Sequence, residues 1–449
     1  MKYEVQKMFS NKKKFSDLIL YILDVLKKKT TGASVYISSI IGMNLNCRNY
    51  HLENLEYNSK NTITITAYHD LKKGVVVSTD LCHNNIIKVV DYLLNIIQYT
   101  SIDKFSSLPD VGLLAFTCKK IDLFYPWTFE TSKLLDYSYR IEKSALNYNK
   151  LIITTENINI SSYINYHFFG NSYGMLQNYK TTLHSLYSEM ISKNQTSTMQ
   201  RDFSYSVSRS YKDLQSPDWV GLNSAKKAAN RLFSIKIKTQ SCPTIISSNV
   251  VDIFFSSFIQ SIRGMNVYRK TTLLYHNLNT RIFPTWLNIF ENPHIHKGLS
   301  SKPFDQEGVK TQKRFIVHQG ILKTWLLDTY SSRKLNLCNT GHFGNIYNWL
   351  VSGAEDISLQ DLFKKMCKGL FVTEFMGNGT NIITGDYSVG IFGFWVERGI
   401  IQYPVSEITI SGNLKHMWKN IISISNDIEY NNTIRCGSIL LDNMQISGI

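Results

Sequence analysis

The two histidines with the clearest metal-ligating spacing are His294 and His296, in the segment PHIHKG. On an extended segment, residues two apart project to the same side, so both imidazoles could face one ion. Asp305 or Glu307, further along the chain, could supply a carboxylate ligand. A solvated loop beside a proline and a glycine explains the same residues, and we favour that interpretation over a metal site.

A second group of polar side chains follows glycines in the C-terminal half. His342 and Asn345 lie in GHFGN, and Asp386 and Tyr387 lie in TGDYS. A glycine directly before His342 and Asp386 allows a turn that could lift the polar side chain into a cleft. These four residues are candidates for lining a groove or an interface, although Asp and Asn also cap turns for purely structural reasons.

Several reactions have no support in this sequence. It contains no phosphate-binding P-loop, no dinucleotide fingerprint and no GxSxG nucleophile elbow. Each of these sites needs a glycine-rich turn of fixed spacing to hold a phosphate or a nucleophile. Nucleophilic hydrolysis by serine or cysteine is therefore not indicated.

Length and composition indicate a multidomain protein of the cytoplasm. The 449 residues are 43% hydrophobic, which is enough for two or three domains with a substantial core. Seven cysteines with wide spacing and no CxxC point to a reducing compartment. The apolar run Leu18 to Leu26 is flanked or interrupted by aspartates and followed by lysines, so we expect neither a signal peptide nor a membrane span.

The formal charge of +15 raises the question of nucleic-acid binding. The lysines are spread along the chain beside many Asn, Ile and Tyr residues instead of forming a basic stretch. Because a high net charge speaks to non-specific binding and solubility, we do not expect a nucleic-acid surface.

The order of helical and strand-like patterns predicts an α+β fold with three domains. Residues 1–125 form an αββα-type domain, in which Ser16 and Asp80 are the expected helix caps. Residues 126–236 form a central α+β domain, and residues 237–449 form a larger β-rich domain with a hairpin turn at Gln319-Gly320. Ser358 and Asp361 form a capping box for a short helix.

The segment from Thr373 to Asn413 alternates glycines and aromatics with β-branched residues, which predicts short strands joined by tight turns, one of them at Arg398-Gly399. It resembles the C-terminal signature of the PmbA/TldE proteins. These are companions of TldD in the group once called modulators of DNA gyrase and now treated as metalloproteases, peptidase family U62. Similar phrases along the chain are STDL, FGNSYGM, RDFSYSVSR, VYRKTTLL and GHFGNIYNW. Their order covers nearly all of the chain, which is identified as a member of this family.

The resemblance implies a zinc site on the TldD-like partner and none on this chain. In the TldD branch, a helix with HExxxH supplies two histidine ligands and a glutamate general base. Here Phe255, Ser256 and Gln260 stand roughly at those positions, on a helix from Val250 to Ile262 whose apolar stripe predicts core packing. Cys436 stands where the zinc-bearing branch is expected to supply a late cysteine, yet one thiolate cannot hold zinc alone, and we expect a buried apolar role.

The resemblance also implies a function. We expect a subunit of a TldD/TldE metalloprotease that acts on unfolded peptides, with leader-peptide trimming and antitoxin turnover as the family's associated roles. Edge strands of the β-rich C-terminal domain would suit an extended peptide. Arg269 and Lys270, in VYRKTT, could steady a peptide carboxylate or carbonyl, or simply be a solvated strand end.

Two other functions stay open at this point. The chain could be a metalloprotease in its own right with unrecognised ligands, or a non-enzymatic regulator that binds gyrase or RNA. It could also form a homodimer when the TldD-like partner is absent. No membrane partner is expected.

Overall fold

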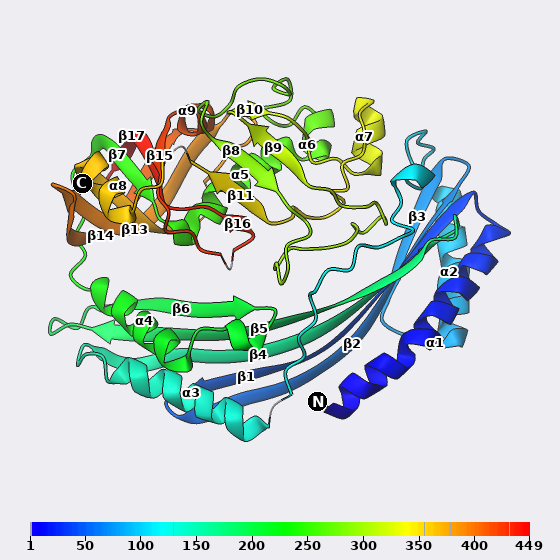
Figure 1. Cartoon of the computed structure of the whole chain (residues 1–449), viewed down its shortest axis with the longest axis horizontal. Helices are drawn as coiled ribbons and strands as arrows, with labels where there is room; N and C mark the ends of the chain where they lie inside the picture. Colours follow the sequence, from blue (N-terminus) through cyan, green and yellow to red (C-terminus); the bar gives the residue numbers. More distant parts are fainter. Residues whose placement is uncertain (1, 129, 354, 378, 431) are drawn as a thin grey trace.

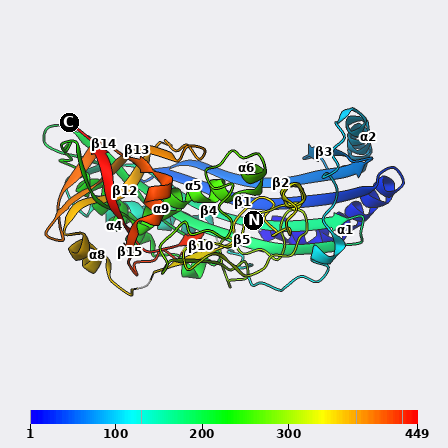
Figure 2. The same cartoon turned by 90° about the horizontal axis from the view of Figure 1, so that it is seen from above.

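The computed structural model describes residues 2–128, 130–353, 355–377, 379–430 and 432–449. It has the mixed α+β fold that the sequence predicts. One long curved sheet lies on one side of the molecule, and a β-rich C-terminal part lies over its concave face (Figure 1). From above, α2 and β3 lie at the end of this sheet that is far from the chain's C-terminus (Figure 2).

Six antiparallel strands form the long sheet, in the order β3-β2-β1-β4-β5-β6. They are β1 (Gly32–Arg48), β2 (His51–His69), β3 (Lys72–Ser78), β4 (Ile152–Asn171), β5 (Leu176–Lys193) and β6 (Met199–Ser208). Strands β1 and β4 pair from Ser34 opposite Asn171 to Cys47 opposite Ile158. This pairing joins strands from both sides of the expected boundary near residue 125, and the division into three domains stays a prediction.

Four helices cover the convex face of the long sheet (Figure 1). They are α1 (Lys2–Lys27), α2 (His83–Tyr99), α3 (Thr131–Leu146) and α4 (Pro217–Asn230). Alternate strand residues such as Val35, Ile37 and Ile65 pack into the core with α1 and α2. Side chains between them, such as Tyr36 and Thr64, face the C-terminal part instead.

Two expected helix caps are wrong. Helix α1 begins at Lys2, so Ser16 lies inside it. The segment before Ser16 contains several Lys residues, a Glu and a Gln, all of which favour a helix. The N-cap of α2 is Cys82, which makes no side-chain capping bond. Asp80 instead accepts a hydrogen bond from the Cys82 backbone N–H at 2.9 Å, which is an Asx-type turn before the helix.

The C-terminal part contains a closed ring of strands. Strands β14-β13-β12-β7-β17 pair in that order, and β14 pairs again with β17. They are β7 (Gln240–Ile246), β12 (Lys368–Met376), β13 (Asp386–Glu397), β14 (Ile400–Asn413) and β17 (Ile439–Ser447), with β15 (Ile421–Ile424) attached to β17. The closure joins β14 to β17 over three residues only, Thr409 to Ser411.

A second C-terminal sheet has the order β10-β9-β8-β11-β16. Its strands are β8 (Asn288–Glu291), β9 (Arg314–His318), β10 (Ile321–Leu322), β11 (Trp349–Ser352) and β16 (Ile434–Arg435). Helix α5 (Val251–Ile262) packs in one apolar core with residues of both sheets. The predicted core-packing role of this helix is confirmed, since Phe254, Phe255 and Phe258 are all buried.

The local turn predictions are confirmed. Gln319 and Gly320 have φ of 50° and 74° between β9 and β10, and Arg398 and Gly399 have φ of 53° and 72° between β13 and β14. Ser358 caps α8 (Leu359–Met366) by accepting from the Asp361 N–H. The remaining short helices are α6 (Gly264–Tyr268), α7 (Thr329–Leu335) and α9 (Leu414–Lys419).

Among the helices of the described residues, none is long and apolar enough to cross a membrane.

Candidate functional site

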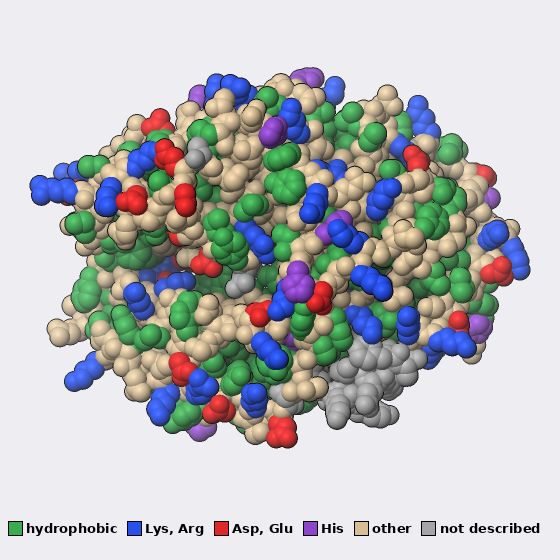
Figure 3. Space-filling model, in the orientation of Figure 1, with side chains coloured by type: hydrophobic (Ala, Val, Ile, Leu, Met, Phe, Trp, Pro, Cys, Tyr) green, Lys and Arg blue, Asp and Glu red, His purple; other side chains and the backbone are tan. Residues whose placement is uncertain are grey.

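Strand β6 forms one edge of the long sheet, and its free side opens into a groove. Within the sheet it pairs only with β5, so every second backbone N–H and C=O of the strand points away from its neighbour. A pocket of about 200 Å³ lies along this edge, between Trp219 and Asn223 of α4 and Glu429 of the C-terminal part. Figure 3 shows the surface hollowed between the C-terminal part and α4. We call this pocket and strand the β6 groove.

An aromatic row borders the β6 groove. The rings of Tyr187 and Phe203 stack with centroids 5.7 Å apart, and those of Phe203 and Tyr205 stack at 6.3 Å. Phe203 is 39% exposed and Tyr205 is 43% exposed, which is high for side chains of this size. The row offers an apolar surface beside the strand edge, the combination that binds an extended peptide. The Phe203 N–H already donates to Asp202 Oδ1 at 2.7 Å, so the open part of the edge is the segment Ser204 to Val207, where the pocket lies.

The alternation of residues in β6 produces this arrangement. Phe203 and Tyr205 point to the concave face, whereas Ser204 and Ser206 are buried on the other side. Ser204 Oγ accepts a hydrogen bond from Asn223 Nδ2 at 2.9 Å, which ties the strand to α4. Tyr205 donates its hydroxyl to Asn432 Oδ1 at 3.4 Å, so the row also reaches the C-terminal part.

Arg231 closes one end of the β6 groove. Its guanidinium donates to the Arg201 carbonyl oxygen at 2.9 Å and forms an ion pair with Glu374 of β12. The same group lies 4.0 Å from the ring centroid of Phe392. Because Arg231 is almost fully buried, these contacts fix the long sheet against the C-terminal part at this point.

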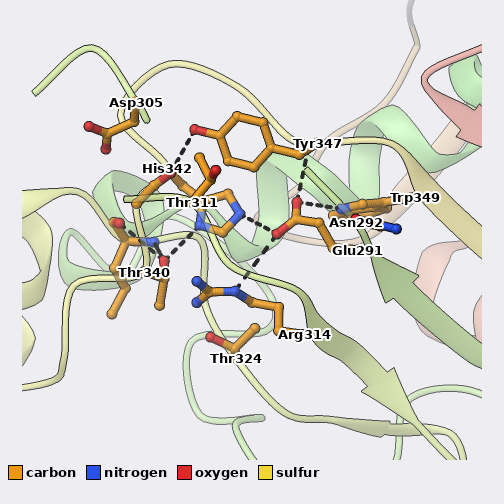
Figure 4. A network of polar contacts seen from close by, with 12 residues as sticks. Glu291, Asn292, Asp305, Thr311, Arg314, Thr324, Thr340, His342, Tyr347 and Trp349 are labelled. Atoms are coloured by element: carbon orange, nitrogen blue, oxygen red, sulfur yellow. Dashed lines mark hydrogen bonds and ion pairs between the residues drawn. The ribbon is translucent and has the colours of Figure 1, made fainter. Parts of the chain in front are cut away.

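His342 lies in a buried polar network around Glu291 (Figure 4). Its Nε2 is 2.9 Å from Glu291 Oε2, and its Nδ1 is 2.8 Å from Thr340 Oγ1. Glu291 Oε1 accepts from the Tyr347 backbone N–H at 3.0 Å and from Trp349 Nε1 at 2.9 Å. The side chains of Glu291 and His342 are both fully buried, so this network holds β8 to β11 and has no open face for a substrate.

The other expected groove residues do not gather with His342. Asn345 and Arg269 are exposed, and Arg269 contacts the neighbouring Tyr268 at 3.2 Å. Asp386 is exposed at the start of β13 and accepts from Thr384 Oγ1 at 2.6 Å, which is the turn-capping role that the sequence also allowed. Tyr387 is buried, and this burial raises the pKa of its phenol.

His294 and His296 face different partners. Their segment consists of turns, so the expectation of an extended segment with both imidazoles on one side is wrong. His294 Nε2 lies 3.1 Å from Thr311 Oγ1, whereas His296 Nε2 lies 3.2 Å from the Tyr125 hydroxyl. Among the described residues, no three His, Cys, Asp or Glu side chains lie together in a way that could hold a metal ion.

The side chains at the expected zinc positions do not fit zinc. Phe255 is fully buried in the core, Ser256 donates to the Ile253 carbonyl at 2.6 Å, and Gln260 is exposed. None of these is an imidazole or carboxylate ligand. Cys436 is fully buried, and burial, with Asp427 nearby, raises the pKa of its thiol well above the usual range, which disfavours the thiolate.

The sequence did not single out β6 as a site. The alternation of Phe203 and Tyr205 with serines was present in RDFSYSVSR. What the pattern could not show is that β6 lies at an edge, because this depends on the order of six strands.

Most of the chain is similar to known proteins. Residues 124–232 match the PmbA/TldA metallopeptidase central domain, and residues 239–448 match the PmbA/TldA metallopeptidase C-terminal domain. A metalloprotease PmbA homolog of Buchnera aphidicola (subspecies Acyrthosiphon pisum) is 47% identical, with 95% of each chain covered.

A candidate modulator of DNA gyrase from Bacteroides thetaiotaomicron superposes with a TM-score of 0.91 at 22% identity, covering 96% of this chain and 98% of that one. TldE from Thermococcus kodakarensis gives a TM-score of 0.83 at 16% identity, covering 96% and 100%. The two structural likenesses establish the fold alone.

Proposed function

This chain belongs to the PmbA/TldD family of metallopeptidases, and we propose that it is the PmbA/TldE-type subunit of a two-subunit metalloprotease that acts on unfolded peptides. In this proposal the zinc ion is held by a TldD-like partner, and the present chain holds the peptide. The shared ancestry with proteins named metalloproteases supports the peptidase role, and the similarity to TldE supports the subunit role.

The observation that carries the peptide-holding role is the free edge of β6 with its aromatic row. An extended peptide can add to a sheet edge through backbone hydrogen bonds, which do not depend on sequence. The exposed rings of Phe203 and Tyr205 can then contact apolar side chains of that peptide. A folded protein presents few free extended segments, so such an edge selects unfolded substrates.

The proposed absence of metal chemistry on this chain rests on its side chains. The positions that would carry two histidines and a glutamate are occupied by Phe255, Ser256 and Gln260. We therefore assign no catalytic step to residues of this chain. Its contribution is to bind the peptide, orient it and help enclose it.

Peptide binding by the chain alone tests the role of the β6 groove. We expect the double variant Phe203→Ala, Tyr205→Ala to bind an apolar, fluorescently labelled unfolded peptide at least about tenfold more weakly, because it removes the exposed anchors. The matched control is Tyr92→Ala, Tyr99→Ala, which truncates two side chains that are 64% and 89% exposed on α2. Equal binding by both double variants would contradict the proposal.

Zinc content and cleavage test the division of labour. We expect the dialysed chain alone to hold close to no zinc and to leave peptides intact, and a mixture with a TldD-like protein to cleave them. About one zinc ion per lone chain, together with cleavage, would favour a metalloprotease in its own right. Variants at Cys436, His294 and His296 would then locate the ligands.

A further inference from the structure

A partly open cavity lies between the concave face of the long sheet and the C-terminal part, away from the β6 groove. Its volume is about 320 Å³, which is in the range of small-molecule sites. The sheet contributes side chains from β1, β2, β3 and the end of β4, and the C-terminal part contributes the loop 304–310 between β8 and β9. The connection between α2 and α3 adds Leu108 and Pro109.

The loop 304–310 is held rigidly at this cavity. Asp305 is buried, and its Oδ1 accepts from the backbone N–H groups of Glu307 and Val309, both at 2.9 Å. The Gly308 carbonyl accepts from the Ala115 N–H at 3.0 Å, and Gly308 has a φ of 82°. A Cβ at Gly308 would lie 2.5 Å from the Phe169 ring, so the loop packs directly on the sheet. This packing fixes where the Glu307 carboxyl stands.

Two opposite charges face the cavity without pairing with each other. Glu307 lines it from the loop, and Lys73 lines it from β3. Glu307 Oε2 accepts from the Thr329 N–H at 2.9 Å and from the Thr329 hydroxyl at 2.5 Å. Lys73 Nζ stands 5.8 Å from the ring centroid of Tyr68, and within the described chain it forms no ion pair.

Glu307 and Lys73 are both half-buried. Burial raises the pKa of Glu307, although the positive charge of Lys73 acts in the opposite direction. A half-buried carboxylate and a half-buried ammonium each gain when an opposite charge enters the site. The rest of the wall is mixed: Phe169, Phe343 and Val75 offer apolar surface, and Ser34, Thr64, Thr66 and Gln306 offer polar groups.

We propose that this cavity binds a free α-amino acid with an apolar side chain, whose ammonium group pairs with Glu307 and whose carboxylate pairs with Lys73. A zwitterion satisfies both charges at once, whereas a simple cation leaves Lys73 unpaired and a simple anion leaves Glu307 unpaired. A residue inside a peptide chain has neither a free α-ammonium group nor a free α-carboxylate. The hydroxyl groups of Tyr68 and Thr66, which also line the cavity, can hydrogen-bond the ligand's polar end.

Titration calorimetry on the full chain tests this proposal, with three forms of one ligand. The probes are L-phenylalanine, N-acetyl-L-phenylalanine and L-phenylalaninamide. We expect L-phenylalanine to bind and each blocked form to bind at least about tenfold more weakly, because each has lost one of its two charges. Equal binding of all three forms, or no binding of L-phenylalanine at millimolar concentration, would overturn the proposal.

Variants assign the two contacts. We expect Glu307→Gln and Lys73→Met each to reduce L-phenylalanine affinity at least about tenfold, with Glu53→Gln and Lys60→Met on the exposed part of β2 as controls. Unchanged affinity in a folded Glu307→Gln or Lys73→Met protein would also overturn it. If a variant does not fold, the three ligand forms on the unaltered chain still decide. The assay needs no partner and no peptide cleavage, so its failure leaves the proposed peptidase role standing.

Discussion

Two regions of the C-terminal part bury carboxylates in opposite ways. Around Glu291, three donors meet one carboxylate, the Tyr347 N–H, Trp349 Nε1 and His342 Nε2, and Arg314 Nε forms an ion pair with it at 3.8 Å. In the loop 304–310, two carboxylates lie close together, and Asp305 receives only backbone N–H groups.

The difference distinguishes the Glu291 network, which is part of the structural interior, from the loop 304–310, which forms a cavity wall that can bind a ligand. The Glu291 network is continuous with the aromatic core, because Trp349 packs against Phe258 of α5 at 5.9 Å between ring centroids. The loop 304–310 instead borders a cavity, and among the described residues its acidic pair forms no ion pair with a Lys or Arg side chain. Completed polar networks stabilise, whereas incomplete ones mark places where another molecule can complete them.

The largest expected effect is a loss of stability in the aromatic core beside the Glu291 network. Phe258→Ala should lower the free energy of unfolding by roughly 3 to 5 kcal/mol, because the ring is fully buried between Phe283 and Trp418. Chemical denaturation measures this change, and any loss of activity should follow loss of folded protein.

The matched control for this variant lies on the same helix. Ile253→Ala truncates a side chain of α5 that is 46% exposed, and we expect a change within about 0.5 kcal/mol. A Phe258→Ala protein with normal stability and no activity would place Phe258 in a functional site and contradict the structural role of this core.

A smaller loss of stability is expected when the Glu291 carboxylate itself is changed. Glu291→Gln should cost about 1 to 3 kcal/mol of stability, because an amide NH₂ replaces an acceptor where only donors converge. Thermal unfolding measures it, with Glu53→Gln as the exposed control. If Glu291→Gln left stability unchanged while peptide processing with the partner stopped, the network would be functional and not structural.

Local features of this fold could be predicted from the sequence, and long-range ones could not. The apolar stripe of α5 and the turns at Gln319-Gly320 and Arg398-Gly399 depend on residues within a few positions of each other. The contact between His342 and Glu291 joins residues 51 positions apart, and no local pattern indicates it. Asp305 and Glu307 were expected only as ligands beside two histidines, whereas tertiary packing buries Asp305 and leaves Glu307 half-buried on a cavity wall.

The most specific effect concerns pH, and it tests the contrast between the two carboxylate sites. Burial and the neighbouring Glu307 charge raise the pKa of Asp305 from its ordinary value near 4 to about 8. Between these values the folded protein holds a proton that the unfolded chain has released, so this group makes stability fall as pH rises from about 4 to about 8.

The variant Asp305→Asn tests this pH dependence. Its side chain cannot ionise, and we expect its unfolding temperature to fall less over this range than that of the unaltered chain. Its absolute stability should be lower at pH 5, because one acceptor of backbone N–H groups is lost. Asp442→Asn, at an exposed position of β17, should keep the original pH profile. An Asp305→Asn protein with the original profile would mean that the loop carboxylate is already ionised in the folded protein.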